Sequence, residues 1–558
     1  MASALQWVPD TLYNMSLSHS VTFVRNNNSL IKQLPKDILF DIYYRLYKQG
    51  KLCLLGMEMS ELRVFEKILQ VNGKRHLLHH CFQALVDHGS GISKALADHY
   101  SQYCCILHCA PVEQKKRAIN LGISLGTFLC DAGWYGDSDL VFAACLQLCK
   151  TIPNSDLYVR IKALDCCISL IHIRCCFGKF SEAVSAFEES QVLTNEIQEQ
   201  GLRINLAGLY AEYCFLHFVQ SKFDEAYGFA SKALKLLNKN LPARTIVDVL
   251  RQAARICVVK RKFHGAELLI KHAVKLAMDK FGSNHPKTAS VLSDYGFYLL
   301  NVDCVGQSVQ VYQTALNIRQ SVFGGCNLLL STSHEDLAYA CYVNEYNFGI
   351  FTDAREHIEK AMELMKQLLP SDHLLLASTS RVKALILEEI ALEIENKDEC
   401  QKLLEDAHEL HLSALHLTRS AFGDMNKARK MHLSAIAIKE TLLGTEDYEV
   451  ALSIGHLASL YAYDMHLYDD AEKLYLRSIS VGVKLFGEAY SGLEYDYRGL
   501  LRVYSSLNIP DKIQNYRNIL DNWKRLRDER AGAVESPLLN MPVNLSTEDL
   551  IKEFFEIC

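Results

Sequence analysis

The clearest pattern of small and apolar positions lies in residues 247–325, where the same spacing occurs twice. The matched positions are Ala254, Ala266, Ile270 and Ala273 in the first copy, and Gly296, Ser308, Tyr312 and Ala315 in the second. Each copy closes on Phe-Gly, at Phe281 and Phe323, which gives a period of 42 residues. Small residues let antiparallel helices approach closely, and a period in this range indicates stacked helical hairpins. The pattern predicts an all-α fold, a tetratricopeptide-type superhelical solenoid.

Weaker copies of the pattern extend the predicted solenoid over residues 73–520. An aromatic residue three positions before an alanine marks the turn inside the hairpins, at Phe180, Phe223 and Phe263. These positions are 43 and 40 residues apart. The near-constant spacing predicts that the hairpins continue on both sides of the clearest copies.

The repeats become longer after residue 325. The turn at 344–351 has four extra residues, and the next predicted hairpin pairs 382–394 with 400–422. A regular repeat returns at 457–487, and a last hairpin runs from 495 to about 520. Long turns fall on one side of a solenoid and often shape its binding surface.

One interval between the glycines that close the repeats is half a period. The intervals between Gly423, Gly444 and Gly487 are 21 and 43 residues. Ala428, His432 and Ala435 align with positions in the second helix of the following repeat. The first helix of their own repeat is therefore missing. Either the solenoid contains one unpaired helix here, or the sequence omits the residues of its partner.

Residues 1–72 and 521–558 lie outside the repeat pattern. Near the N-terminus, an amphipathic segment at 11–24 is followed by a second one that begins at Leu34-Pro35. Two interpretations are open for this region: a cap for the end of the solenoid, or a surface on which a partner docks. At the other end, a linker precedes a short helix at 550–557, which we interpret as a docking or packing helix.

Composition narrows the class of function. The net charge of −6 is not that of a nucleic-acid-binding protein, which normally carries a basic excess. Many of the 19 cysteines fall on apolar helix faces without regular spacing, so we expect free thiols rather than a disulfide framework. The sequence has no apolar run long enough to span a bilayer and no signal-peptide pattern at its start. We expect a soluble intracellular protein that contacts membranes only at their periphery.

Candidate catalytic and metal-binding residues do not form a recognisable motif. His408 and His411 are three residues apart, whereas the metalloprotease motif requires a spacing of four. A denser group of potential metal ligands comprises His76, His79, His80 and Cys81, but no second pair stands at the distance of a structural site. We therefore expect no enzyme activity, no metal and no cofactor.

The function is then expected in the concave groove, which the first helix of each hairpin lines. Counting from the small residue of each first helix places a set of polar and aromatic side chains there. They are Asp248, Arg251, Arg255, Asn301, Glu335, Tyr339, Tyr342, Ser459, Tyr463, Tyr495, Arg498 and Arg502. Arginine suits a peptide carboxylate and acidic residues suit a basic side chain, so we expect this surface to bind peptides. For any single position, a solvated surface residue is the simpler interpretation.

Four segments carry a resemblance to a known family: residues 7–14, 74–85, 294–303 and 493–500. They resemble the amyloid protein-binding protein 2 family, and the similarity covers nearly the whole chain except the missing helix and the tail. The resemblance implies a substrate receptor of a cullin-2 RING ubiquitin ligase, recruited through elongin B and elongin C. It also implies recognition of C-terminal degron peptides that bear arginine and glycine, and repeats similar to those of kinesin light chain.

By this similarity, the N-terminal region contains two docking sequences. The elongin-C box would comprise Leu12, Ser16 and Val21. The cullin-2 box would comprise Leu34, Pro35 and Ile38. Ser20 departs from the aliphatic residue that the elongin pattern expects, so the box begins at either Leu12 or Leu17. The resemblance favours docking over capping for residues 1–72.

Two functions follow from the resemblance. The first is a substrate-recognition subunit whose partners are elongin B/C, cullin-2, the RING subunit and substrate C-terminal peptides. The second is an adaptor for intracellular transport that links membrane-protein tails, such as that of amyloid precursor protein, to microtubules. The expected location is the cytoplasm, with the nucleus, the cytoskeleton and membrane surfaces as further sites, and a homodimer is left open.

Overall fold

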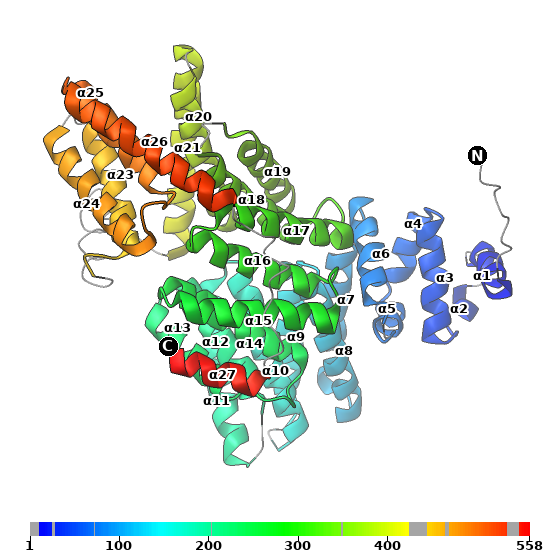
Figure 1. The fold of residues 1–558 in the computed structure, drawn as a ribbon. Coiled ribbons are helices and arrows are strands. Elements are labelled where there is room, and N and C mark those ends of the chain that lie inside the picture. The colour runs from blue at the N-terminus through cyan, green and yellow to red at the C-terminus, as the bar shows by residue number, and fades with distance from the viewer. Residues whose placement is uncertain are drawn as a thin grey trace, which may run out of the picture.

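The computed structural model describes residues 11–24, 28–71, 73–153, 155–201, 204–346, 350–394, 396–422, 444–463, 468–532 and 546–557. Within these ranges the chain is built from helices and contains no strand. None of the helices in these ranges is long and apolar enough to cross a membrane. The helices stack side by side into a curved array, which confirms the predicted all-α solenoid (Figure 1).

Short helices form the N-terminal region. They are α1 (Leu12–Phe23), α2 (Asn28–Ile31), α3 (Lys36–Lys48), α4 (Leu52–Met59) and α5 (Leu62–Leu69). The hydroxyl of Thr11 caps α1 by accepting a hydrogen bond from Asn14 N at 3.2 Å. α1 packs on α3, and its Leu17, Val21 and Val24 are buried. Figure 1 shows this region at one end of the array.

Longer helices in antiparallel pairs form the rest of the array. It begins with α6 (Arg75–Asp87) and α7 (Ile92–Ile106), which lead through a 3-10 turn at Leu107–Cys109 into the first pair. The pairs are α8 (Val112–Asp131) with α9 (Tyr135–Lys150), α10 (Leu157–Cys176) with α11 (Phe180–Glu199), α12 (Leu206–Val219) with α13 (Phe223–Lys235), α14 (Ala243–Val259) with α15 (Phe263–Phe281), α16 (Pro286–Asn301) with α17 (Val305–Phe323), α18 (Leu328–Glu345) with α19 (Thr352–Leu368), α20 (Leu375–Glu393) with α21 (Lys397–Phe422), α23 (Tyr448–Tyr463) with α24 (Tyr468–Phe486) and α25 (Leu493–Ser506) with α26 (Pro510–Gly532).

A small residue on one helix and a ring on the next set how closely a pair approaches. Gly296 in α16 faces the ring of Tyr312 in α17, where a Cβ atom would lie 2.9 Å from ring carbons. Ser308 donates a hydrogen bond to the carbonyl of Gly296 at 2.8 Å. Ser138 makes the same hydrogen bond to Gly126 in α8/α9 at 2.7 Å. The offset of 12 residues found in the sequence therefore corresponds to a repeated contact between paired helices.

One superhelical turn brings segments that are distant in sequence into contact. Asn327, which precedes α18, is 0% exposed and donates hydrogen bonds to Gln83 Oε1 at 3.2 Å and Ala132 O at 2.8 Å. These bonds join residues 244 and 195 positions apart. Further along, the rings of Phe177 and His373 lie 4.5 Å apart between centroids. Successive turns of the array are therefore fastened to each other.

A second contact between distant segments joins the turn before α17 to the C-terminal helices. The carboxylate of Asp303 accepts a hydrogen bond from Ser491 N at 3.2 Å and pairs with Arg527 of α26 at 2.8 Å. Asp303 occupies the left-handed region with φ of 63°, as residues in the inter-helix turns often do here. This contact spans 188 residues between Asp303 and Ser491.

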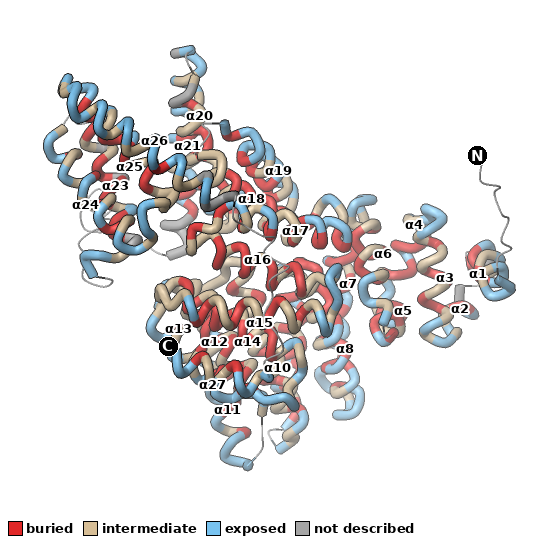
Figure 2. The backbone as a smooth tube through the Cα atoms, in the orientation of Figure 1, coloured by how far each residue is buried: buried red, intermediate tan, exposed pale blue. Residues whose placement is uncertain are grey.

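Buried residues run along the array as a nearly continuous core (Figure 2). One cluster extends from Leu17 of α1 to Leu216 of α12, so the N-terminal helices share the core of the first repeats. α26 continues past the end predicted near residue 520, and its Trp523 is buried and donates a hydrogen bond to Tyr490 O at 2.8 Å. The last helix, α27 (Thr547–Ile557), packs on α15. The half-repeat predicted around Ala428 lies outside the described residues.

Candidate peptide-binding groove

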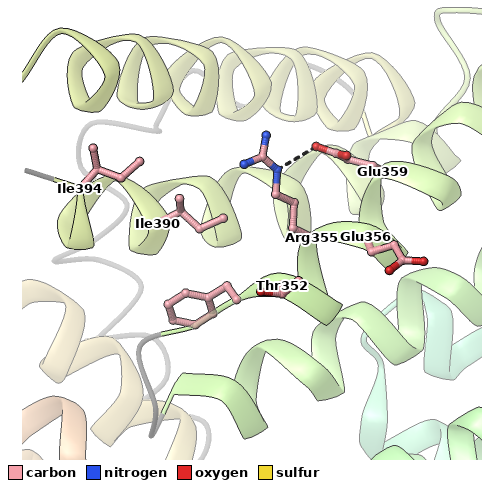
Figure 3. Close-up of a pocket in the computed structure, with 7 residues that line it drawn as sticks. Thr352, Arg355, Glu356, Glu359, Ile390 and Ile394 are labelled. Carbon is pink, nitrogen blue, oxygen red and sulfur yellow. Dashed lines mark hydrogen bonds and ion pairs between the residues drawn. The ribbon is translucent and has the colours of Figure 1, made fainter. Parts of the chain in front are cut away.

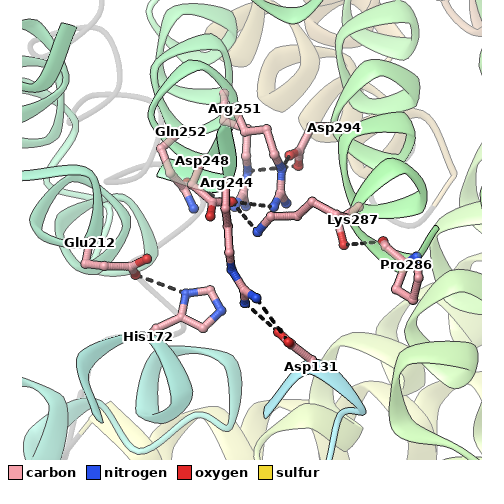
Figure 4. A network of polar contacts seen from close by, with 12 residues as sticks. Asp131, His172, Glu212, Arg244, Asp248, Arg251, Gln252, Pro286, Lys287 and Asp294 are labelled. Atoms are coloured by element: carbon pink, nitrogen blue, oxygen red, sulfur yellow. Dashed lines mark hydrogen bonds and ion pairs between the residues drawn. The ribbon is translucent and has the colours of Figure 1, made fainter. Parts of the chain in front are cut away.

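Charged side chains connect the first helices of the central repeats (Figure 4). Arg251 in α14 pairs with Asp294 in α16 at 2.5 Å and with Asp248, one turn away, at 3.4 Å. Lys287, at the start of α16, pairs with Asp248 at 2.5 Å. We call the surface presented by α10, α12, α14, α16 and α18 the first-helix face. The predicted groove residues Asp248 and Arg251 lie together on it.

The network extends to the neighbouring first helices. Arg244, at the start of α14, donates two hydrogen bonds to the carboxylate of Asp131 at the end of α8, at 3.0 and 2.5 Å. His172 of α10 lies 3.0 Å from Glu212 of α12 (Figure 4). The two hydrogen bonds from Arg244 to Asp131 form a bidentate pair, which suits the planar guanidinium and is the stronger form of charged hydrogen bond. The face thus carries cations and carboxylates in alternation.

Burial and neighbouring charges shift the pKa values of the carboxyls in this network in opposite directions. Burial pushes the pKa of the Asp248 carboxyl up, but Lys287, Arg251 and Arg244 outweigh it and hold the pKa below its usual range. Asp131 behaves in the same way: burial raises its pKa, and Arg244 outweighs that effect. Both carboxyls therefore stay ionised at neutral pH, and the face keeps a fixed pattern of charge.

Arg255 is held differently from Arg251. Its guanidinium lies over the rings of Phe215 and Phe218, at 5.4 and 4.5 Å from their centroids. Its Nη1 donates a long hydrogen bond to Gln252 Oε1 at 3.5 Å, and its Nε is 3.7 Å from Asp294, a looser ion pair than that of Arg251. Cation–π contact orients the guanidinium without using up its hydrogen-bond donors. Arg255 is therefore the arginine of this network best placed to exchange its partner for a ligand carboxylate.

A second part of the predicted surface is rich in tyrosine. The rings of Tyr339 and Tyr342 in α18 lie 6.1 Å apart, and that of Tyr346 is 6.2 Å from Tyr495 of α25. The hydroxyls of Ser459 and Tyr495 are within hydrogen-bond distance of each other at 2.5 Å. We call these residues the tyrosine cluster.

Carboxylates border the tyrosine cluster. Burial raises the pKa of Tyr342 and of Tyr346, and Glu389 raises both further. Glu335, also in α18, accepts hydrogen bonds from Ser378 and Thr379 of α20, the latter at 2.6 Å. Aromatic faces next to carboxylates attract cations. This part of the surface suits a basic side chain.

Other predicted groove residues are not part of these two sets. Asn301 donates a hydrogen bond to Phe297 O of its own helix at 2.8 Å. Arg498 is exposed and pairs with Glu494 one turn away at 2.7 Å, and Arg502 is exposed. The side chain of Tyr463 lies outside the described residues. Burial raises the pKa of Tyr346 and the charge of Arg498 opposes that rise, so Arg498 borders the tyrosine cluster.

Several charged residues of the network were absent from the prediction. They are Asp131, His172, Glu212, Arg244, Lys287 and Asp294. Lys287, Asp294 and Asn301 follow one another at intervals of seven residues, about two helical turns, on the same stripe of α16. That stripe was a usable signal, but the prediction took only Asn301 from α16.

A cavity of about 430 Å³ adjoins the tyrosine cluster (Figure 3). Its walls are formed by Phe351, Thr352, Arg355, Glu356, Glu359, Ile390 and Ile394. Arg355 donates a hydrogen bond to Glu359 at 3.0 Å. Phe351 also stacks on Tyr342, with centroids 5.8 Å apart. The long turn predicted before α19 therefore ends at this cavity.

The predicted docking residues of α1 divide between surface and core. Leu12 is 80% exposed, and the adjacent Tyr13 and Met15 are also exposed. Ser16 is exposed and donates its hydroxyl to Leu12 O at 2.8 Å, whereas Val21 is buried. A buried Val21 holds α1 on α3 rather than contacting a partner directly.

The predicted cullin-2 box lies at the start of α3. Pro35 is the exposed N-cap residue of this helix, and Leu34 and Ile38 are half-buried. The sequence placed Pro35 in the first turn; it stands one position earlier, where it still sets the direction of the chain. α1 and α3 lie at the N-terminal end of the array, away from α14 and α16, whose side chains form the charged network (Figure 1).

The histidines considered as metal ligands have other surroundings. His79 is 5% exposed and stacks on Phe128 with centroids 4.5 Å apart, and burial lowers its pKa to about 3. His411 is half-buried and lies 3.1 Å from Glu388. Across the ranges that the structure describes, no group of three or more His, Cys, Asp or Glu side chains is arranged to hold a metal ion.

Comparison with known proteins identifies the family. The chain is 49% identical over 575 residues to amyloid protein-binding protein 2 of Mus musculus, which covers 99% of this chain and 98% of the mouse protein. The protein of the same name from Rattus norvegicus gives the same values. The chain belongs to the amyloid protein-binding protein 2 family. No family model matches the chain.

Solved structures resemble this member of the family less closely. A Rap protein complexed with competence and sporulation factor is 14% identical and covers 70% of this chain and 99% of its own, with a TM-score of 0.41. The apo form of RapI is 13% identical and covers 66% of this chain and 98% of its own, with a TM-score of 0.37.

Proposed function

We propose that this protein is a non-catalytic substrate-recognition subunit of a cullin-2 RING ubiquitin ligase. The observation that carries the proposal is the 80% exposure of Leu12 on a helix that is held on α3 by the buried Leu17 and Val21. An exposed leucine with Tyr13 and Met15 beside it is a typical anchor for a helix-binding partner. Elongin C would dock there and bring elongin B. Cullin-2 would dock at Leu34, Pro35 and Ile38 and bring the RING subunit.

The first-helix face would bind the substrate. Arg255, oriented by two aromatic rings, suits the terminal carboxylate of a degron peptide, and the tyrosine cluster with its carboxylates suits a basic side chain. The receptor performs no chemistry itself. It raises the effective concentration of substrate lysines near the ubiquitin-charged enzyme. We expect this to take place in the cytoplasm.

The second candidate is a transport adaptor for membrane-protein tails. The relatives are named for binding amyloid protein, which favours a membrane-protein tail as one occupant of the same surface. In this role the protein would link such a tail to microtubules. The two functions share the peptide surface and differ in whether elongin B/C binds to α1.

Pull-down with purified elongin B/C and cullin-2 separates the candidates. Leu12→Asp with Pro35→Ala should lose both ligase components while peptide binding is unchanged. Ile106→Asp is the matched control, because Ile106 is an equally exposed apolar residue at 78% on α7. If the double variant keeps elongin B/C, or if the unmodified chain never binds it, the ligase function is wrong.

Peptide binding is tested with one degron sequence in two forms. A free C-terminus should bind and a C-terminal amide should not, because the amide removes the charge that Arg255 would pair with. Arg255→Gln should weaken the free form at least tenfold, whereas Arg525→Gln, a 62% exposed arginine on α26, should not. Equal affinity for the two peptide forms would show that the surface reads an internal motif instead.

A further inference from the structure

The last helix of the chain is anchored to the solenoid by two apolar side chains. Leu550 and Phe554, one turn apart in α27, are 0% and 1% exposed. They belong to the same core cluster as residues of α12 to α17. α27 packs on α15 (Figure 1), and Lys235 of α13 lies 5.3 Å from the ring centroid of Phe555. A segment outside the repeats thus completes part of the repeat core.

The surface that receives α27 has a defined chemistry. Leu268 and Leu276, two turns apart on α15, lie at the partly buried edge of the same cluster. Lys235 of α13 lies beside α27, over the ring of Phe555, and Lys271 of α15 is paired with Glu267 of its own helix. α27 itself carries four carboxylates and one lysine. We call the surface formed by Leu268, Leu276 and Lys235 the α15 docking surface.

The helix would have little stability on its own. α27 has 11 residues, and helices of this length are marginal in water without tertiary contacts. Ser546 caps it by accepting a hydrogen bond from Asp549 N at 3.1 Å, so its start is encoded locally. Its remaining support comes from the α15 docking surface. The arrangement is that of a helix laid in a groove through apolar residues four apart.

We propose that the α15 docking surface is a second binding site, separate from the first-helix face. Its ligands are acidic amphipathic helices with a leucine and a phenylalanine four residues apart, and α27 is its intramolecular occupant. A partner helix of this class binds by displacing α27. The proposal does not depend on the ligase function, because neither α1 nor the charged network takes part.

The test uses a fluorescently labelled synthetic peptide of residues 546–558 and two forms of the protein. A chain that ends at residue 545 should bind the peptide in an anisotropy titration, and the full chain should bind it at least tenfold more weakly because α27 occupies the site. A Phe554→Ala peptide should lose at least tenfold in affinity for the shortened chain. An Ile557→Ala peptide is the matched control, since Ile557 is 49% exposed, and should bind unchanged.

A full-length variant with Leu550→Asp and Phe554→Asp provides a second receiving protein if the shortened chain does not fold. It should bind the unmodified peptide, as should a designed acidic helix that shares only the leucine, the phenylalanine and the four carboxylates. Replacing those carboxylates with lysine should abolish binding. Failure of both receiving proteins to bind, or equal binding by the unmodified full chain, would overturn the proposal.

Discussion

At the scale of single residues, the charged side chains of the first-helix face stabilise one another through shared partners. Asp294 contacts both Arg251 and Arg255, and Asp248 contacts both Arg251 and Lys287. A half-buried charge that loses its partner pays the cost of desolvation without compensation. Removing one member of an ion pair should therefore lower the free energy of unfolding more than removing both members.

We expect Arg251→Met to lower the free energy of unfolding by about 1–3 kcal/mol, because it leaves Asp294 with only the looser contact to Arg255. The double variant Arg251→Met with Asp294→Leu should recover at least half of that loss. Arg525→Met, which removes an exposed pair on α26, should change stability by less than about 0.5 kcal/mol. Urea denaturation of the four proteins measures the differences, and a double variant less stable than the single one would contradict the interpretation.

A buried carboxyl on α25 gives stability a dependence on pH. Asp496 is 5% exposed, and burial raises its pKa to about 7, against an opposing effect of Ser478. The folded state holds the proton of Asp496 more tightly than the unfolded state does. The stabilisation that this carboxyl contributes is therefore complete below about pH 4 and is lost as pH rises through about 7. Asp496→Asn should therefore gain in melting temperature relative to the unmodified chain between pH 5 and pH 8. A constant difference between the two proteins would show that Asp496 does not titrate in this range.

At the scale of helices, the fold depends on close approach within each pair. Gly126 in α8 faces Phe142 of α9, where a Cβ atom would lie 2.5 to 2.9 Å from the ring. Phe142 is 1% exposed, so its ring has little room to move. The alanine that normally stabilises a helix is therefore unfavourable at this position.

We expect Gly126→Ala to destabilise the protein by about 1–3 kcal/mol through overpacking. Gly228→Ala in α13 is the matched control, because no atom lies within 4 Å of its Cβ position, and it should stabilise by about 0.5–1 kcal/mol. Thermal denaturation of the two variants should shift the melting temperature in opposite directions. Equal shifts would mean that the glycines of the repeat do not set the helix spacing.

Much of this level could be predicted from the sequence, because paired helices are neighbours in the chain. The period of 42 residues and the offset of 12 located the hairpins and the positions of Gly296 and Ser308. The end of α26 was not predicted, since its extension to Gly532 involves the contact of Trp523 with Tyr490, which lies outside the helix itself. The packing of α27 on α15 also joins distant segments, and its amphipathic pattern alone left docking and packing equally open.

At the scale of the whole molecule, contacts between successive superhelical turns determine the shape of the surface. Asn327 bonds to Gln83 and Ala132 across 244 and 195 residues, and such pairings depend on the rotation accumulated over several repeats. A repeat pattern specifies which residues are neighbours within a hairpin, but it does not specify the rotation accumulated over several repeats. The charged network was found only in part for the same reason: Asp131 reaches Arg244 across 113 residues.

Asn327→Ala should loosen two distant segments together. The change leaves Gln83 and the carbonyl of Ala132 without these hydrogen bonds in a buried site, at a cost of about 1–3 kcal/mol. Amide hydrogen exchange should become faster in α6 and in the start of α18 at once, whereas Asn317→Ala, at an exposed position of α17, should change neither. Faster exchange in α18 alone would show that the turns are not coupled through Asn327.

The exposed surface of α1 and the first-helix face lie at different places in the array, and the ligase function requires both in one molecule. The most direct test is ubiquitin transfer in a reconstituted system of elongin B/C, cullin-2, its RING subunit and a substrate ending in a C-terminal degron. The unmodified chain should support transfer, Ile106→Asp should support it equally, and Leu12→Asp and Arg255→Gln should each reduce it at least tenfold. Transfer by Leu12→Asp at the rate of the unmodified chain would contradict the proposed role of α1.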